Sequence, residues 1–264
     1  MSGMTLAFAA TLAGLGFAGA FIAGLVGVGG AIVMIPLLYY IPPWLGVGVL
    51  DIKLVAGVTM GQVLAAAIVG AAVHGGTGAV HRPLAVVAGA SMAIASLAGA
   101  VASRFVGGRT LLAVFGTMGL LAFLLMLLPP PPEPAMPAEA EIAFDRKAAM
   151  VYPAVIGLLS GLVGAGGAFL IMPVLFGLMR IPLRLSIGTS LAIAGISALA
   201  GFLGKLVTSQ VPLWPTVAVV MGSLAGAGVG ARASHRAPTR VLRASLGALI
   251  AVVTLRVWID VLFH

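Results

Sequence analysis

The sequence GLVGVGGA at residues 24–31 returns almost unchanged as GLVGAGGA at residues 161–168. Each copy lies inside a long apolar run, and a proline follows each at the same distance, as Pro36 and Pro173. The two copies are 137 residues apart (161 minus 24). Each glycine weakens a helix by up to about 1 kcal/mol relative to alanine. The pattern therefore predicts one interrupted helix in each half of the chain.

Further matches extend this repeat toward the end of each half. They keep a spacing of 131 residues (188 minus 57), and they pair Gly57 with Gly188, Thr59 with Ser190, Arg109 with Arg240 and Gly116 with Gly247. The six-residue difference between the two spacings (137 minus 131) corresponds to one insertion in the first half, around residues 41–50. An ordered series in two consistent registers indicates an internal duplication, which is frequent in membrane transporters.

The composition excludes a water-soluble domain. Hydrophobic residues make up 61% of the chain and charged residues only 8%, whereas soluble domains contain about 25% charged residues. The apolar residues form blocks near the ~20 residues that a membrane helix needs, at 5–40, 54–73, 83–103, 110–128, 148–179, 185–207, 213–231 and 241–262. We predict an all-α integral membrane protein with about eight transmembrane segments in two homologous four-segment repeats, whose first segments are broken by glycine.

A proline-rich stretch divides the chain. Residues 129–147 read PPPPEPAMPAEAEIAFDRK, and proline both ends helices and favours extended chain. We expect a first membrane repeat at 1–128, an exposed linker at 129–147 and a second membrane repeat at 148–264.

The basic residues indicate an orientation and no nucleic-acid partner, because they are spread between the apolar blocks. If all eight blocks cross, nine lie on one side (Lys53, Arg104, Arg109, Arg180, Arg184, Arg232, Arg236, Arg240, Arg243) and four on the other (Arg82, Arg146, Lys147, Lys205). The richer side should be cytoplasmic. That would put both termini and the linker on the non-cytoplasmic side of the cell (inner) membrane. The first block of each half exceeds one crossing, so each is alternatively a helix plus a short re-entrant arm. An odd number of crossings per half would invert the repeat.

Several chemistries are absent from the sequence. The chain has no cysteine, so it has no disulfide and no cysteine-based metal site. None of its six acidic residues lies centrally in an apolar block, whereas cation carriers and proton pumps usually need carboxylates at that depth. There is no HExxH, no Walker sequence and no nucleophile–His–acid set. We expect a protein that is not an enzyme and that uses no metal or cofactor.

The glycine sequences are the first candidate site. A helix that restarts at Ala31 or Ala168 directs free N–H groups and a positive dipole end at what lies before it, which suits an anion. The backbone expected to bind substrate comprises Gly27, Gly29, Gly30, Ala31, Gly164, Gly166, Gly167 and Ala168. The alternative is that these glycines only permit tight helix crossing. We expect that packing role of Gly70, Gly89, Gly99, Gly222, Gly226 and Gly230.

Polar side chains supply the remaining candidates. Thr59 and Gln62 are three residues apart and so share a helix face, while Thr189 and Ser190 occupy the matching region of the second half. All four side chains either line a substrate path through the membrane or bond a neighbouring helix. Two cationic candidates occupy matching positions, His74 and Lys205 (205 minus 74 is 131). They form a gate or an anion-attracting vestibule, or they extend to water at the interface. Arg256 can pair with Asp260, four residues on.

The chain resembles the sulfite exporter TauE/SafE family, also called the TSUP family of small-anion permeases, over essentially its whole length. The matching sequences are GLVGVGGAIVMIPLL (24–38), GLVGAGGAFLIMPVL (161–175), GVTMG (57–61) and IGTSLA (187–192). Family members often carry a third glycine where this chain has Ala31 and Ala168. The resemblance implies an inner-membrane carrier of sulfite, organosulfonates or related small anions. A passive anion channel and a non-transporting membrane scaffold are the alternatives.

Overall fold

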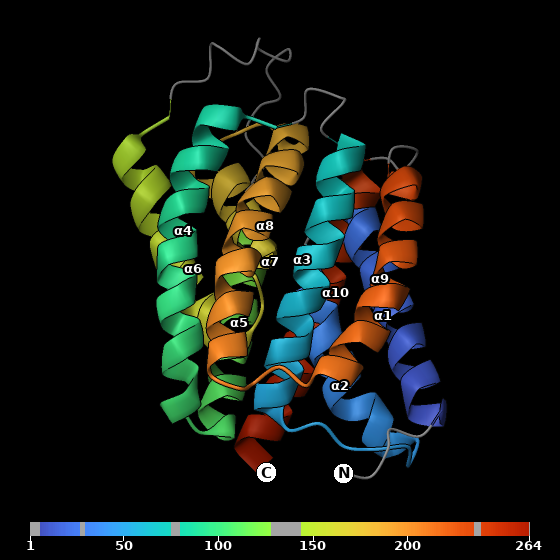
Figure 1. Ribbon diagram of the computed structural model, residues 1–264. Coiled ribbons are helices and arrows are strands. Elements are labelled where there is room, and N and C mark those ends of the chain that lie inside the picture. Colours follow the sequence, from blue (N-terminus) through green and yellow to red (C-terminus); the bar gives the residue numbers. More distant parts are fainter. Residues whose placement is uncertain (1–5, 27–29, 75–79, 128–143, 235–238, 264) are drawn as a thin grey trace.

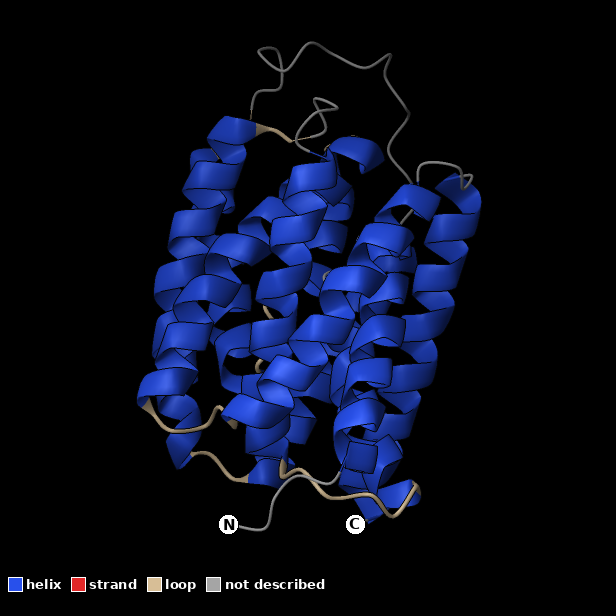
Figure 2. Ribbon diagram, turned by 45° about the vertical axis from the view of Figure 1, so that its right-hand side comes forward, coloured by secondary structure: helices blue, strands red, loops and turns tan. Residues whose placement is uncertain are grey.

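The computed structural model describes residues 6–26, 30–74, 80–127, 144–234 and 239–263. The predicted site residues Gly27 and Gly29 lie outside these ranges. Within them the chain is helical and forms no strand (Figure 2). The helices are α1 (Leu6–Val26), α2 (Ala31–Trp44), α3 (Ile52–His74), α4 (Arg82–Ala102), α5 (Gly108–Leu127), α6 (Arg146–Val163), α7 (Ala168–Pro173), α8 (Leu183–Val207), α9 (Leu213–Ser234) and α10 (Thr239–Phe263). A π-helical turn, Val174–Leu178, continues α7, and a 3-10 turn, Ser103–Phe105, follows α4.

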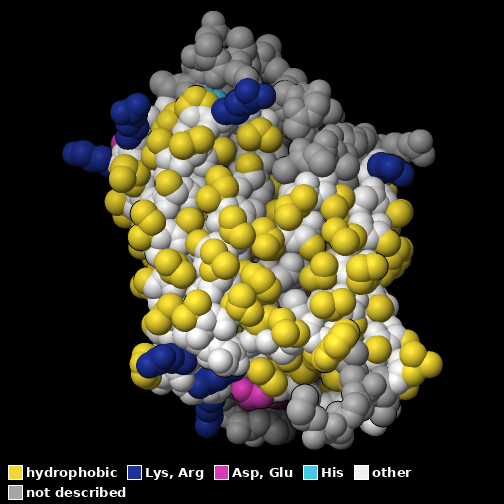
Figure 3. Space-filling model, viewed as in Figure 1, with side chains coloured by type: hydrophobic (Ala, Val, Ile, Leu, Met, Phe, Trp, Pro, Cys, Tyr) yellow, Lys and Arg dark blue, Asp and Glu magenta, His cyan; other side chains and the backbone are white. Residues whose placement is uncertain are grey.

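Seven of the described helices, α1, α3, α4, α5, α6, α8 and α9, are long and apolar enough to cross a membrane. Helix α10 is also long, at 25 residues, but it contains three arginines and Asp260. In Figure 3 apolar side chains cover the flank of the bundle, and the lysines and arginines gather at its two ends. Exposed tryptophans, Trp44 at the end of α2 and Trp214 near the start of α9, lie at one end, as expected at a membrane–water interface. The chain is a multi-pass membrane protein.

Both expected helix breaks are present. In the second half α6 ends at Val163, Gly164 to Gly167 form the break, and α7 begins at Ala168 after Gly167, which has φ 75°. In the first half α2 begins at Ala31 after Gly30, which has φ 83°. Glycine adopts this left-handed conformation without the steric cost that a Cβ brings. The prediction that helices restart at Ala31 and Ala168 is confirmed.

Each break reverses the chain, so the first block of each half is not a single crossing. Helix α2 returns to the end of the bundle where α1 begins (Figure 1). Gly48, which follows α2, lies against the ring of Phe8 near the start of α1. Helix α7 and its π-helical turn reverse the direction of α6 in the same way (Figure 1). Of the two alternatives left open by the sequence, the structure has the helix with a short returning arm.

This reversal corrects the predicted placement of the linker. Both termini lie at one end of the bundle, whereas α5 ends and α6 begins at the other (Figure 1). The start of α5 is fixed at the terminal end, because Arg109 donates hydrogen bonds of 3.1 and 2.8 Å to the carbonyl of Val261 near the end of α10. The expectation that the termini and the linker share one side is therefore wrong. The two halves run through the bundle in opposite directions, because each returning arm adds a reversal.

The linker is also shorter than expected at its end. Helix α6 begins at Arg146, and the Asp145 side chain caps it by accepting a 2.8 Å hydrogen bond from the Lys147 N–H. Arg146 and Lys147 thus belong to the second membrane repeat, and residues 128–143 lie outside the described part of the chain.

Glycines hold two equivalent helix pairs close together. Helix α9 packs on α1, and α4 packs on α6. A Cβ atom on Gly222, Gly226 or Gly230 would collide with backbone oxygens of α1, and one on Gly99 would collide with the backbone of α6. Gly89 instead faces the Ile196 side chain. The packing role is confirmed for these five glycines, and the surroundings of Gly70 lie outside the described part.

Candidate functional site

The first glycine break lies against a buried amide. Gln62, near the middle of α3, has no exposed surface. A Cβ atom on Gly30 would lie 2.8 Å from Gln62 Nε2 and 3.1 Å from Gln62 Oε1. Neither of these side-chain atoms has a hydrogen-bond partner among the described residues. Thr59, one turn earlier on α3, is equally buried, and its Oγ1 is also unpartnered there. Because buried polar groups are nearly always hydrogen-bonded, this pair requires an explanation.

The backbone N–H groups of a helix start lie at the same place. The N–H groups of Val33 and Met34 donate to the Gly30 carbonyl at 3.1 and 2.9 Å. The N–H groups of Ala31 and Ile32 therefore precede the first hydrogen-bonded turn of α2. Helix α2 has 14 residues, so its buried start carries the partial positive charge of a helix N-terminus. The Gln62 amide lies against Gly30 at this helix start, and Thr59 lies one turn earlier on α3.

The second break is filled by neighbouring atoms. A Cβ atom on Gly164 would collide with the backbone of Ala56 in α3, and one on Gly166 would lie against the Val63 side chain. A Cβ atom on Gly167 would meet the Met92 side chain in α4. Ala168 is fully buried. Helix α3 therefore contacts both breaks, through Gln62 on one side and through Ala56 and Val63 on the other.

The predicted hydroxyls of the second half have local partners. Thr189 Oγ1 accepts a 3.0 Å hydrogen bond from the His81 N–H, and Ser190 Oγ donates to the Ile187 carbonyl at 2.9 Å. Both residues are fully buried in α8. The structure thus leaves unpartnered polar atoms at Thr59 and Gln62 but not at the Oγ atoms of Thr189 and Ser190.

Lys205 does not extend to water. It is fully buried, and its Nζ donates to Ser103 Oγ at 2.6 Å, to the Leu162 carbonyl at 3.0 Å and to Gln210 Oε1 at 3.1 Å. The interfacial interpretation of Lys205 is wrong, because the amine bonds three oxygens, which come from the 3-10 turn after α4, from α6 and from the segment after α8. Its bond to Leu162 supplies a cationic partner at the C-terminal end of α6, next to the break. The side chain of His74 lies outside the described part.

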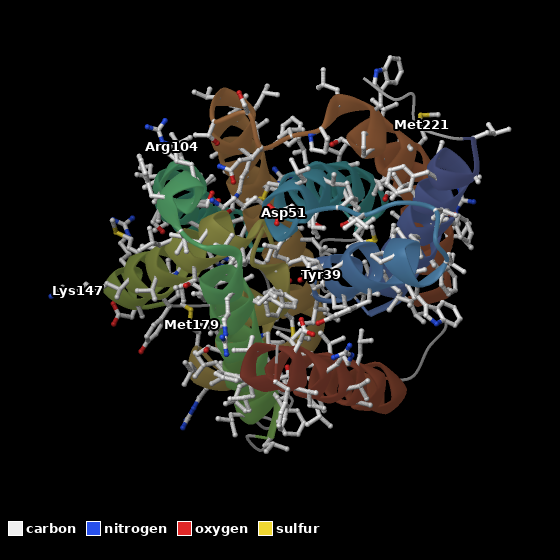
Figure 4. All side chains as sticks on the ribbon, turned by 90° about the horizontal axis from the view of Figure 1, so that it is seen from below. Tyr39, Asp51, Arg104, Lys147, Met179 and Met221 are labelled. Carbon is white, nitrogen blue, oxygen red and sulfur yellow. The ribbon has the colours of Figure 1, made fainter. Side chains whose placement is uncertain are left out.

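The described acidic residues lie near helix ends. Asp51 precedes α3 and is exposed, and Asp145 caps α6. The predicted pair of Arg256 and Asp260 is confirmed, with 3.8 Å between Arg256 Nη1 and Asp260 Oδ1. In the end-on view of Figure 4, Asp51 and Tyr39 lie near the middle of the bundle, whereas Arg104 and Lys147 lie at its rim. The described residues contain no cluster of His, Asp or Glu that could hold a metal ion.

Sequence reasoning missed the residues that partner Thr189 and Lys205. His81 caps α4 by accepting a 3.2 Å hydrogen bond from the Leu84 N–H at its Nδ1, and it contacts the Phe144 ring. A polar residue shortly before Pro83 was the available signal, since proline is frequent in the first turn of a helix. Ser103 and Gln210 gave no local signal, because their role depends on contacts between distant segments.

Comparison with known proteins agrees with this architecture. The model of the family described as Sulfite exporter TauE/SafE matches residues 12–257. A "Probable membrane transporter protein" of Xylella fastidiosa (strain 9a5c) is 27% identical over 239 residues, which cover 90% of each chain. The "Probable membrane transporter protein YdhB" of Bacillus subtilis (strain 168) is 26% identical over 230 residues, 85% of this chain and 90% of that protein. No solved structure gives a significant match. The chain belongs to the sulfite exporter TauE/SafE family.

Proposed function

We propose that this protein is a secondary transporter that moves a small anion, a sulfite, an organosulfonate or a related sulfur oxyanion, across the cell membrane. Membership of the TauE/SafE family supports the substrate class. The multi-pass helical architecture and the relatives named as probable membrane transporter proteins support membrane transport.

The observation that carries the proposal is the buried start of α2. Gly30, the residue before α2, lies against the buried Gln62 amide, and neither this amide nor the Thr59 hydroxyl one turn earlier on α3 has a hydrogen-bond partner among the described residues. A helix N-terminus attracts an anion without a fixed counter-charge. Two of the described acidic residues, Asp51 and Asp260, lie at the end of the bundle that holds the termini, close to helix ends. A carboxylate beside the anion would repel it strongly in a low-dielectric interior.

The arrangement of the halves supports alternating access. Transporters with halves of opposite direction bind substrate near the midplane, at discontinuous helices, and expose it by moving one part against the other. Here α1 with α9 and α4 with α6 form the closely packed units. In our proposal these pairs move against each other as rigid bodies, and the breaks before α2 and α7 lie where they meet.

The charge distribution supports one orientation. The end of the bundle where α5 stops and α6 starts holds Arg82, Arg146, Lys147, Arg180, Arg184, Arg232, Arg240 and Arg243. The end with the termini holds Lys53, Arg104 and Arg109, together with Arg256 and the buried Lys205. Since the Lys/Arg-rich side is usually cytoplasmic, we place the connection between α5 and α6 in the cytoplasm and both termini outside.

Uptake into proteoliposomes tests the function. Purified protein should take up labelled sulfite or a sulfonate saturably, and it should show counterflow when the inside is preloaded, which a passive channel would not. Sodium and potassium serve as cation controls. Flux should survive replacement of both Asp51 and Asp260 by Asn. Saturable cation uptake without anion uptake, abolished by Asp51→Asn, would contradict the proposal.

A further inference from the structure

The two glycine breaks differ in chemistry, although their sequences match. Gln62 corresponds in the repeat register to Ile193 (62 plus 131), an apolar residue that is fully buried in α8. Thr59 corresponds to Ser190, whose hydroxyl is used by its own helix at 2.9 Å. The second half therefore has no equivalent of the two α3 side chains, Thr59 and Gln62, whose polar atoms have no hydrogen-bond partner among the described residues.

The second break is also closed by its own contacts. Its glycines are packed against the backbone of Ala56 and the side chains of Val63 and Met92. Lys205 donates a hydrogen bond to the carbonyl of Leu162 at the end of α6. Helix α7 has only six residues before the π-helical turn, so it offers a weaker positive end than the 14-residue α2. These contacts indicate that the second break serves packing and not substrate binding.

The amide at the first break makes a specific demand on a ligand. Gln62 Nε2 is a donor and Gln62 Oε1 is an acceptor, and both are buried without a partner in the described part of the chain. An anion with only acceptor oxygens would satisfy Nε2, and its charge would suit the N–H groups of Ala31 and Ile32. Such an anion would leave Oε1 unpaired, and an unpaired buried acceptor is costly.

We propose that the first break is the only substrate site, and that it selects an anion that carries a hydrogen-bond donor, such as a hydroxyl group, a protonated oxygen or an ammonium group, beside its acceptor oxygens. The substrate's charged oxygens accept from Ala31, Ile32 and Gln62 Nε2, and its donor group bonds Gln62 Oε1. The Thr59 hydroxyl, which is both donor and acceptor, bonds either the charged oxygens or the donor group of the substrate. This inference rests on the proposed anion transport and adds the chemistry of the substrate.

Two sulfonates of equal charge and equal heavy-atom number test whether the ligand needs a hydrogen-bond donor. 2-Hydroxyethanesulfonate has a hydroxyl donor where propane-1-sulfonate has a methyl group. In wild-type proteoliposomes we expect the hydroxy compound to compete with a labelled sulfonate at least about tenfold more strongly, the size of effect that one unpaired buried group produces. Gln62→Met removes the amide at similar volume and should reduce this ratio to about one while leaving some anion uptake.

Ile193→Leu is the matched control, because it changes the corresponding position of the second half at constant volume. It should keep the wild-type ratio. Equal competition by the two sulfonates in wild type would overturn the inference and leave anion transport standing, whereas absence of any anion uptake would remove the proposed function itself. Loss of the ratio in Ile193→Leu would show that the second break also binds substrate. The wild-type competition decides the point even if Gln62→Met does not reach the membrane.

Discussion

The side chain of Gln62 lies so close to the backbone of Gly30 that a methyl group on Gly30 would come within 2.8 Å of Gln62 Nε2. The N-terminus of α2 and the middle of α3 thus meet at one point, although 32 residues separate them in sequence (62 minus 30). This contact places a side-chain amide beside the free backbone donors of a helix start, and the first prediction follows from it.

Gly30→Ala should reduce transport far more than it reduces stability. The substitution forces alanine to φ 83°, at a cost of about 1–2 kcal/mol, and it also pushes the Gln62 amide away from the break. Gly46→Ala is the matched control, because Gly46 has φ 66° but nothing lies within 4 Å of its Cβ position. We expect similar losses of thermal stability in detergent for both variants, but a more than tenfold loss of anion uptake only for Gly30→Ala. Equal uptake in the two variants would contradict a binding role for the first break.

The packing of α1 on α9 gives a second pair of opposite predictions. Gly222→Ala places a methyl group against the carbonyl of Ala13, and this backbone contact cannot relax by a change of rotamer. Gly14 lies on α1 with nothing within 4 Å of its Cβ position, so Gly14→Ala should stabilise the helix by up to about 1 kcal/mol. The melting temperature in detergent should fall for Gly222→Ala and rise for Gly14→Ala. A fall of equal size in both variants would show that glycine at these positions serves something other than close approach.

The sequence predicted local features well and long-range ones poorly. The restarts at Ala31 and Ala168 follow from glycines in the immediate sequence, and the close approaches at Gly99 and Gly222 follow from the spacing of small residues. The reversal of α2 and α7 depends on how they pack against α3 and α8, which no local pattern encodes. The partner of the Thr189 hydroxyl is the N–H of His81, 108 residues away in the sequence. The register already separates the halves by pairing Gln62 with the apolar Ile193, but only the structure shows which hydroxyls and amides have partners.

The buried Lys205 should contribute to stability through its hydrogen bonds. Lys205→Met keeps an apolar chain of similar length but leaves the Leu162 carbonyl without the 3.0 Å bond from Nζ, which should cost about 1–3 kcal/mol. Ser103 and Gln210 keep their 3.0 Å hydrogen bond to each other. The control is Lys53→Met, because the Lys53 side chain donates to the carbonyl of Arg104 at the exposed bundle end, where substitutions usually change stability by less than about 0.5 kcal/mol. Thermal unfolding in detergent measures both variants, and an unchanged melting temperature for Lys205→Met would show that the cost of burying the amine cancels the contribution of its hydrogen bonds.

The orientation can be tested directly, because the chain has no cysteine and every introduced thiol is unique. Val49 lies between α2 and α3 at the terminal end of the bundle and is 76% exposed, and Ala135 lies in the linker sequence. The excess of lysine and arginine at the end where α5 stops predicts that this end faces the cytoplasm. In intact cells a membrane-impermeant thiol reagent should therefore label Val49→Cys, and it should label Ala135→Cys only after lysis. The reverse pattern would place the arginine-rich end outside and would leave the inverted arrangement of the halves intact. Labelling of both thiols in intact cells would contradict the arrangement itself, because the described ends of α5 and α6 lie opposite the termini.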